Sequence, residues 1–285
     1  MIDSHIHLSY RFYAQSFPYV AINEREFIIR YGNRDSLIEE MKNVGVTCCI
    51  EPALDVESNR ILLDLCQEYP DYIYPTVGNH PTRCIKSSIL DFKKMSEYAK
   101  NQRIVAIGET GLDYHYKRSK QHRLRQKIWF CWQINLADKY RLPLILHIRM
   151  ADKEAIRILR KNKTKLHGGV CHCFGSGPDV AKIYTEEMGL YLGVGGTILM
   201  RSEISALLQD AVVNTPLEYL VLETDGPYVK PIKPENISKK SWMKARNTSL
   251  ILPAVAQRVA ELKGISVEDV LRVTEENTRR LFHIG

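Results

Sequence analysis

The chain has 285 residues, of which 45% are hydrophobic and 26% charged, and it carries a formal net charge of +7. This composition excludes a disordered chain, and no apolar run approaches the roughly 20 residues that a membrane-spanning helix needs. The length accommodates one large α/β barrel or two small domains. The positive charge suits a polyanionic partner but does not identify one.

The seven cysteines are odd in number and include no Cys-x-x-Cys pair, which argues against a disulfide framework or a zinc ribbon. Cys171 and Cys173 flank His172 on a predicted strand, so we expect both to face away from it as buried thiols. No basic segment followed by an apolar stretch precedes the first predicted strand, so a signal peptide is not expected. We therefore expect a cytoplasmic protein.

Short apolar or β-branched runs alternate with amphipathic stretches along the chain. The predicted strands are 1–8, 46–53, 73–79, 103–109, 143–148, 168–173, 190–195 and 219–225. The predicted helices include 35–44, 57–69, 122–140, 151–162, 249–263 and about 266–282. Strand and helix alternating eight times indicates a TIM-type (β/α)8 barrel that forms a single domain over 1–285, with the final helix on its outside. The competing open sheet would need a glycine-rich turn after the first strand, and none is present.

Two long segments follow the ends of predicted strands. Residues 9–33 form an insertion rich in Tyr and Phe after the first strand, and residues 226–249 form a basic loop after the last. Because both follow the C-terminal end of a strand, we expect both at the catalytic face of the barrel. The insertion overhangs the site in one interpretation and docks a partner protein in another.

Residues that commonly bind metals lie at the ends of the predicted strands, where barrel active sites are built. His5 and His7 share one face of the first strand with Asp3, because alternate residues of a strand point the same way. Four other strands end in the remaining candidates, Glu109, His147, His172 and Asp225. One isolated histidine is more often a core residue, but six candidate ligands at strand ends favour a metal centre.

Six ligands exceed the number that one tetrahedral zinc needs, so we expect two divalent metal ions. Four imidazoles and two carboxylates suit zinc, manganese or a similar ion such as magnesium better than calcium. Glu109, from a middle strand, is the expected bridging carboxylate. Asp225 can bind one ion and also take the proton of the attacking water.

Six motifs occur in a fixed order along the chain. They are His5-Ile-His7, Gly78-Asn-His-Pro81, Gly108-Glu-Thr-Gly-Leu-Asp-Tyr114, Leu142-Pro-Leu-Ile-Leu-His147, His172-Cys-Phe174 and Glu223-Thr-Asp-Gly-Pro-Tyr228. With these motifs the chain resembles the TatD family of metal-dependent deoxyribonucleases, which belongs to the amidohydrolase-like barrel superfamily. Arg246-Asn247 and the segments 265–270 and 277–282 fit the tail of the same family.

The resemblance implies hydrolysis of DNA phosphodiester bonds, often as a 3′-to-5′ exonuclease on single strands. It assigns the metal ligands to the same six residues, places His80 as a catalytic residue near the scissile phosphate, and makes Arg149 a phosphate contact. Gly226 replaces the family's usual alanine or serine, and Ser249 replaces its usual proline. Residues 9–33 are longer than is typical, which leaves substrate size and end preference open.

Two basic clusters follow strand ends and are therefore expected at the catalytic face. The first comprises Lys117, Arg118, Lys120, Arg123, Arg125 and Lys127, and the second comprises Lys230, Lys233, Lys239, Lys240, Lys244 and Arg246. Cations with interleaved aromatic residues hold single strands through charge and base stacking, so we expect Tyr114, Trp242 and Arg246 to contact substrate. A solvated helix face and an unstructured loop are the plainer interpretations. A third basic run, 157–165, precedes a strand and is expected as solvated surface on the opposite face.

The leading interpretation is a monomeric two-metal phosphodiesterase whose substrate is DNA, with single strands favoured over duplex. A hydrolase of a small phosphorylated or amide substrate on the same barrel is the alternative among enzymes. A nuclease-like subunit of a larger complex, docked through residues 9–33, is the alternative outside enzymes. The complete ligand set argues against that last interpretation, because a decayed site would lose ligands early.

Overall fold

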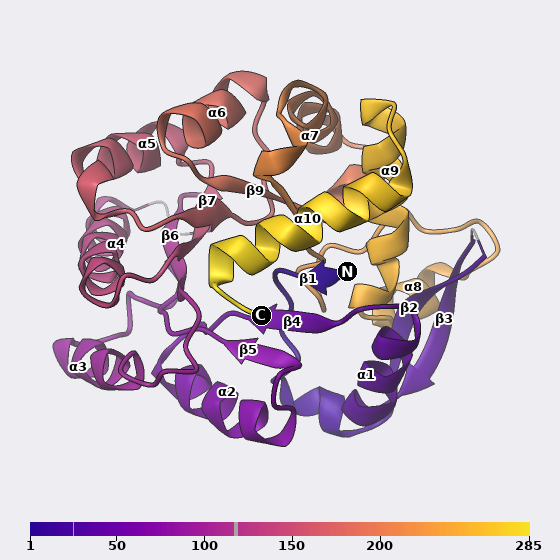
Figure 1. The fold of residues 1–285 in the computed structure, drawn as a ribbon. Helices are drawn as coiled ribbons and strands as arrows, with labels where there is room; N and C mark the ends of the chain where they lie inside the picture. Colours follow the sequence, from indigo (N-terminus) through magenta and orange to yellow (C-terminus); the bar gives the residue numbers. More distant parts are fainter. Residues whose placement is uncertain (25, 117–118) are drawn as a thin grey trace.

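The computed structural model describes residues 1–24, 26–116 and 119–285. Parallel strands surround a central core, and most of the helices cover their outer side (Figure 1). In chain order the strands of the ring are β1 (Ile2–Asp3), β4 (Cys48–Glu51), β5 (Ile73–Pro75), β6 (Ile107–Asp113), β7 (Leu144–Arg149), β8 (Gly169–Cys171), β9 (Tyr191–Val194) and β10 (Leu220–Leu222).

The ring closes through two isolated contacts. The ladders β1–β4–β5 and β6–β7–β8–β9–β10 form separate sheets. Parallel bridges join their edges, one between Ile6 and Gly226 and one between Val77 and Ile107. The backbone N–H of His7 donates to the carbonyl of Gly226 at 2.7 Å. The predicted (β/α)8 barrel is therefore confirmed.

The outer helices sit on the barrel through apolar faces. They are α1 (Arg34–Asn43), α2 (Val56–Glu68), α3 (Ile89–Tyr98), α4 (Lys120–Tyr140), α5 (Asp152–Lys161), α6 (Pro178–Lys182), α7 (Glu203–Asn214), α8 (Lys239–Lys244) and α9 (Leu252–Lys263). Shorter helical turns are η1 (Arg11–Ala14), η2 (Lys163–Lys165), η3 (Ile183–Glu187), η4 (Gly196–Leu199), η5 (Leu217–Tyr219) and η6 (Ser249–Ile251). Within the described residues, no helix combines the length and apolar character that a membrane span requires.

Strand alternation directs the site residues into the barrel. On β7, Leu144 and Leu146 pack in the large core cluster with α4 side chains such as Phe130, whereas Ile145 belongs to a second cluster in the barrel interior. His147 is two residues after Ile145 and therefore points to the same side. The interior thus has an apolar lower layer and a polar upper layer.

The final helix, α10 (Val267–Phe282), crosses the end of the barrel where the strands begin (Figure 1). The prediction that it lies on the outside is wrong. Leu281 and Phe282 are buried in the interior cluster with Ile2, Ile50 and Ile145. The apolar bottom of the barrel would otherwise face water, so burying it favours this position.

We expect Phe282→Ala to lower the free energy of unfolding by about 3–5 kcal/mol, because it leaves a cavity in this closed end. The ring of Phe282 is 1% exposed. Urea unfolding followed by circular dichroism measures the change. Arg272→Ala, on an exposed turn of the same helix, is the control and should change stability far less. Equal effects for both variants would contradict a packing role for Phe282.

The boundaries of two strands differ from the predicted ones in ways that affect the site. β1 ends at Asp3, so Ile2 packs in the interior cluster while Ile6 packs in the outer one, and the single alternating strand expected over 1–8 is wrong. The Asp3 side chain does not point to the metal centre with His5 and His7. Its carboxylate instead accepts hydrogen bonds from the hydroxyls of Thr224 and Ser249. β6 runs on to Asp113 and shifts register between Ile107 and Thr110, so Glu109 lies at an irregularity within the strand.

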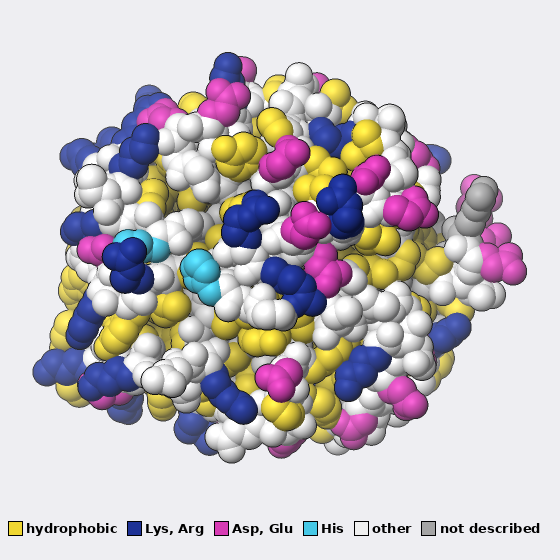
Figure 2. All heavy atoms as spheres, viewed as in Figure 1, with side chains coloured by type: hydrophobic (Ala, Val, Ile, Leu, Met, Phe, Trp, Pro, Cys, Tyr) yellow, Lys and Arg dark blue, Asp and Glu magenta, His cyan; other side chains and the backbone are white. Residues whose placement is uncertain are grey.

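The insertion 9–33 contains η1 and a hairpin of β2 (Phe17–Asn23) and β3 (Glu26–Gly32) that projects from the side of the barrel (Figure 1). The hairpin lies against the basic loop, since the backbone N–H of Val20 donates to the carbonyl of Arg246 at 2.8 Å. Figure 2 shows acidic side chains at the projecting tip. Lys and Arg instead gather on the side where Figure 1 places α3, α4 and α5.

Candidate metal centre

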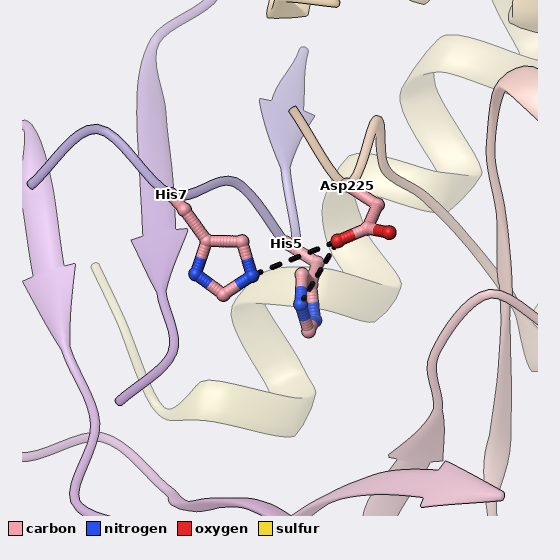
Figure 3. Close-up of side chains that lie close together, drawn as sticks. All are labelled: His5, His7 and Asp225. Carbon is pink, nitrogen blue, oxygen red and sulfur yellow. Dashed lines mark ion pairs between the residues drawn. The ribbon is translucent and has the colours of Figure 1, made fainter. Parts of the chain in front are cut away.

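The six predicted ligands meet at the C-terminal ends of the strands. His5 and His7 come from the segment after β1 and Asp225 from the loop after β10, and Figure 3 shows these three side chains converging. The other three lie on or directly after β6, β7 and β8, and they are Glu109, His147 and His172. Four of these six side chains, His5, His7, Glu109 and His172, are at most 5% exposed.

One carboxylate oxygen of Glu109 faces a first set of donors. Glu109 Oε2 lies 3.7 Å from His5 Nε2 and 3.6 Å from His7 Nε2. Asp225 Oδ1 lies 3.7 Å and 3.6 Å from the same two nitrogens (Figure 3). These separations exceed a hydrogen bond and approach the edge of a tetrahedron around zinc, about 3.3–3.4 Å. The His5, His7 and Asp225 atoms are therefore spaced as ligands of one cation, and Glu109 Oε2 lies beside both histidine nitrogens.

The other carboxylate oxygen of Glu109 faces a second set. Glu109 Oε1 lies 2.8 Å from His172 Nε2, 3.2 Å from His147 Nδ1 and 3.6 Å from His80 Nε2. His147 Nδ1 and His172 Nε2 are 3.0 Å apart. This second set is the more closely packed of the two. Glu109 thus stands between two groups of nitrogen donors with one oxygen toward each.

The first set also shows the polar atoms that a cation would satisfy. Both ring nitrogens of His5 are buried and have no hydrogen-bond partner among the described residues. Unpaired buried polar groups are costly and uncommon. The His5 ring also stacks on the His172 ring, with centroids 3.9 Å apart. The donor types and the unpaired His5 Nε2 both fit a divalent metal ion.

The backbone of β6 holds Glu109 between the two sets. A side chain at Gly78 would begin 2.3 Å from the carbonyl carbon of Gly108, so only glycine allows the segment after β5 to approach β6 this closely. The backbone N–H of Glu109 donates to the carbonyl of Ala53 at 2.9 Å. Register irregularities of this kind redirect side chains near active sites.

Charge and burial oppose each other at this centre. Burial by itself raises the pKa of Glu109, but His172 and His80 outweigh it and hold that pKa well below its usual range. Burial, together with the nearby His172, lowers the pKa of His5 to about 4. Glu109 is therefore an anion and His5 a neutral donor, which are the forms that bind metals.

Asp113 fixes the orientation of His147. Burial lowers the pKa of His147, but hydrogen bonds to Asp113 and Glu109 outweigh it and raise the pKa to about 9. His147 Nε2 lies 3.2 Å from Asp113 Oδ2, while Asp113 Oδ1 accepts the backbone N–H groups of His115 and Tyr116. His147 therefore presents Nδ1 to the second set. Asp113 was not among the predicted site residues, but it lies within the Gly108–Tyr114 motif, so the sequence contained a signal for it.

His80 differs from the other histidines in its hydrogen bonds. Its Nδ1 accepts the backbone N–H of Thr82 at 3.1 Å and lies 2.7 Å from the Thr82 hydroxyl. A neutral ring that accepts at Nδ1 carries its proton on Nε2. Burial, together with the neighbouring His147, lowers the pKa of His80 to about 3, so the ring is neutral. His80 thus presents an N–H donor toward the centre of the site.

Cys171 and Cys173 were both predicted to be buried thiols that face away from His172. Cys171 is buried as predicted, but the prediction for Cys173 is wrong. β8 ends at Cys171, so strand alternation no longer applies, and Cys173 has a positive φ of 47°. Its thiol lies 3.7 Å from Asp225 Oδ2, and its backbone N–H donates to the carboxylate of Glu223. Burial raises the pKa of Glu223 well above its usual range. Sequence reasoning left Glu223 out, although it lies inside the Glu223–Tyr228 motif.

The centre opens into a cavity of 380 Å³. Arg149, a predicted phosphate contact, lines it, as do residues that were not predicted: Tyr10, Leu54, Thr82, Arg83, Asp113, Tyr116, Tyr228 and Val229. The hydroxyls of Tyr10 and Tyr228 lie 2.8 Å apart, so the insertion and the basic loop meet above the site. The three tyrosines among these residues follow the ends of strands, and that position is the sequence signal by which they could have been predicted.

Tyr114, Trp242 and Arg246 do not line this cavity within the described residues. The prediction that Trp242 stacks with bases is wrong, because its ring is 8% exposed and Lys230 Nζ lies 5.6 Å from its centroid. The Tyr114 ring is half-buried beneath Arg123. The Arg246 guanidinium lies 5.3 Å from the ring centroid of Phe12, in the insertion. Arg246 is exposed and Tyr114 is half-buried, so their contacts with substrate stay predictions.

Many of the predicted phosphate-binding cations are engaged within the protein. Arg125 donates to the carbonyls of Cys84 and Ser87, and Lys127 pairs with Glu154 at 2.7 Å. Lys230 and Lys233 donate to carbonyls of their own loop. Exposed cations remain at Lys120, Lys239, Lys240, Lys244 and Arg246, while Lys117 and Arg118 fall outside the described residues. The basic clusters therefore present less free charge than their sequences suggest.

The third basic run lies on the surface away from the site. Arg157 pairs with Glu154 at 2.7 Å and Arg160 with Glu187 at 2.8 Å. Both arginines belong to α5, and the run ends in η2 just before β8 begins. These residues are solvated surface, as predicted.

Solved structures resemble the whole fold. The TatD homologue YjjV of Escherichia coli superposes with a TM-score of 0.83 at 24% identity, covering 100% of this chain and 98% of that one. A TatD family hydrolase of Entamoeba histolytica gives 0.80 at 20% identity, covering 100% and 98%. At these identities the likeness concerns the barrel.

Sequence comparison identifies the family. The profile described as TatD related DNase matches residues 2–283. A metal-dependent hydrolase of Bacillus subtilis, YabD, is 31% identical over 251 residues, covering 88% of this chain and 93% of its own. A protein of Erwinia tasmaniensis named 3′-5′ ssDNA/RNA exonuclease TatD is 31% identical over 255 residues, covering 88% and 94%. The chain belongs to the TatD related DNase family of metal-dependent hydrolases.

Proposed function

We propose that this chain is a two-metal phosphodiesterase that removes nucleotides from the 3′ end of single-stranded DNA. The observation that carries the proposal is the position of Glu109, whose two oxygens face separate sets of donors. A pair of closely spaced ions holds the attacking and leaving oxygens in many phosphoester hydrolases. The exonuclease name of the Erwinia relative supports DNA as the substrate and the 3′ end as the point of attack.

The residues divide into two ligand sets around Glu109. His5, His7 and Asp225 would hold one ion, and His147 and His172 the other. Imidazole donors suit zinc and manganese, and magnesium is a third candidate because of the carboxylates. When bound, such ions polarise the phosphate and make water a stronger nucleophile.

Three side chains have distinct tasks in this proposal. Asp225 directs Oδ1 to the first set, which leaves Oδ2 as an acceptor for the proton of the attacking water. His80 donates its Nε2–H to a phosphate oxygen, since Thr82 occupies its Nδ1. Arg149 lines the cavity and supplies positive charge to the same phosphate.

We propose a single-domain monomer that acts in the cytoplasm. All seven cysteines are free thiols, which supports a reducing compartment. Tyr10 brings the insertion 9–33 to the edge of the cavity, so we assign the insertion to substrate selection. Deleting the hairpin should therefore change which substrates the enzyme cleaves. If the deletion instead abolished binding of a partner protein, the insertion would be a docking surface for that partner.

The test is cleavage of end-labelled single- and double-stranded DNA by metal-free protein with magnesium, manganese or zinc added back. His5→Ala/His7→Ala is assayed beside the wild type. We expect metal-restored shortening from the 3′ end of single strands, which the variant lacks. Failure to cleave with any metal, despite bound metal in elemental analysis, would contradict DNA as the substrate. A small phosphorylated ester would then be the substrate to assay.

Asp113→Asn tests the orientation of His147. The amide oxygen of asparagine can still accept from His115 and Tyr116, but its NH₂ cannot accept from His147 Nε2–H. We expect a 10–100-fold loss of metal affinity or activity, about the usual effect of removing such a partner. Isothermal titration with zinc and the cleavage assay measure it. Unchanged metal affinity and activity would show that His147 keeps its orientation without Asp113.

A further inference from the structure

The cavity of the metal centre continues along the surface. It shares Thr82, Arg83 and Tyr116 with a neighbouring cavity of 350 Å³. That cavity shares Arg83 and Lys86 with a cleft of 680 Å³ lined by α2, α3 and the loop between them. The three cavities therefore adjoin one another in a row from the metal centre past residues 82–86 to the α2–α3 cleft, and we call this row the groove.

The middle of this groove is positively charged. The 350 Å³ cavity is lined by Arg83 and Lys86 together with Thr82, Ile85 and Tyr116, and by no acidic residue within the described part of the chain. Lys86 is exposed and makes no ion pair or side-chain hydrogen bond with any described residue. Its charge is therefore available to a ligand.

The α2–α3 cleft contains acids, but each already has a partner. Asp55 pairs with Arg83 at 3.4 Å, and Glu97 pairs with Lys100 at 2.6 Å. Asp91 accepts from Ser88 at the start of α3, and Glu57 lies 3.9 Å from Arg11. Lys94 also lines the cleft and, like Lys86, makes no ion pair with a described residue. Among the described lining residues, Lys86 and Lys94 thus carry positive charge that no ion pair engages, whereas Arg83 shares its charge with Asp55 and the Asp91 carboxylate has no cationic partner.

The loop that presents these cations is held in place. Arg125 of α4 donates to the carbonyls of Cys84 and Ser87. Asn79 donates to the Ser87 hydroxyl at 2.7 Å. The predicted phosphate contact Arg125 therefore supports the loop from behind. A fixed loop loses less conformational entropy when a ligand binds.

An aromatic ring lies beside the charged section. Tyr116 is 63% exposed, and the Arg149 guanidinium lies 4.9 Å from its ring centroid. Tyr116 lines both the metal-centre cavity and the next one. Alternating cations and exposed rings bind the backbone and the bases of single strands.

We propose that the 5′ part of a single-stranded DNA substrate leaves the metal centre along this groove, with phosphates on Arg83 and Lys86 and a base on Tyr116. The inference rests on the proposed function, because it places the remainder of the strand whose 3′ end is cleaved. The groove makes the enzyme prefer strands of several nucleotides over dinucleotides.

The experiment compares kcat/KM for removal of the 3′ nucleotide from a thymidine ten-mer and from a thymidine dinucleotide, over a series of salt concentrations. Lys86→Ala and Arg83→Ala/Lys86→Ala are the variants. Lys163→Ala, an exposed lysine in η2 just before β8 begins, is the matched control. We expect the ratio of the two kcat/KM values to fall about tenfold in the double variant. The slope of log kcat/KM against log salt concentration should become shallower by about 0.7 for each phosphate that the variant no longer neutralises.

The outcomes separate this inference from the function on which it rests. A fall of the ratio in the groove variants, with none in Lys163→Ala, supports the groove. DNA cleavage whose length preference and salt dependence match the wild type in the double variant would overturn the groove and leave the nuclease function intact. Absence of cleavage of either oligonucleotide by the wild type would overturn both.

Discussion

Replacing Glu109 with alanine is expected to reduce kcat/KM for DNA by on the order of 10³-fold or more, because both ligand sets lose a shared carboxylate. Glu109 lies within 3.7 Å of His5, His7, His147 and His172. The side chain is 2% exposed, so water cannot take its place without reorganising the centre. Metal content should fall below that of the wild type in elemental analysis, together with the rate.

Two further variants make this result interpretable. Glu109→Gln keeps the size of the side chain and one oxygen while it removes the charge, so it should fold like the wild type and still lose activity. Glu261→Ala removes an exposed carboxylate that pairs with Arg258 on α9, and it should leave metal content and rate unchanged. Wild-type metal content in folded Glu109→Ala would show that Glu109 bridges nothing.

Removing both metal ions is expected to abolish cleavage and to lower the melting temperature by about 10–20 °C. Each ion at a hundredfold excess over its Kd stabilises the folded state by about 2.7 kcal/mol. One kcal/mol shifts the melting temperature of a chain of this size by about 2–4 °C. The His5 nitrogens, which are buried and have no hydrogen-bond partner in the described part of the chain, are a physical source of this dependence.

Calorimetry of metal-free protein titrated with magnesium, manganese or zinc measures this shift. His5→Ala/His7→Ala removes the first ligand set and should retain about half of the stabilisation. A melting temperature that none of the three metals changes would contradict a built metal centre. Full stabilisation of the double variant would contradict the assignment of two sets.

The barrel and the family could be predicted because they depend on local and periodic features. Apolar runs alternating with amphipathic stretches indicate strand and helix whatever the tertiary contacts are. Candidate ligands at strand ends converge in any closed parallel barrel. His5, His7, Glu109, His147 and Asp225 therefore needed only the correct strand order to be brought together.

Other features depend on contacts between distant residues. Leu281 and Phe282 belong to an ordinary amphipathic helix by sequence, and only the open apolar end of the barrel draws α10 across it. The sequence predicts Trp242 and Arg125 as nucleic-acid contacts. In the structure Lys230 lies over the Trp242 ring, and Arg125 donates to backbone carbonyls. Whether a cation or a ring is free depends on neighbours that the local pattern does not specify.

Strand period and motif order are local properties of the chain, and they were enough to predict the alternating barrel, the family and the six donors. The folded arrangement was needed to show which oxygen of Glu109 faces which histidines and how Asp113 orients His147. It was also needed to show that Lys86 has no ion-pair partner among the described residues. These arrangements depend on distances of a few ångströms between segments far apart in the chain. Such distances arise only when the ring of strands closes.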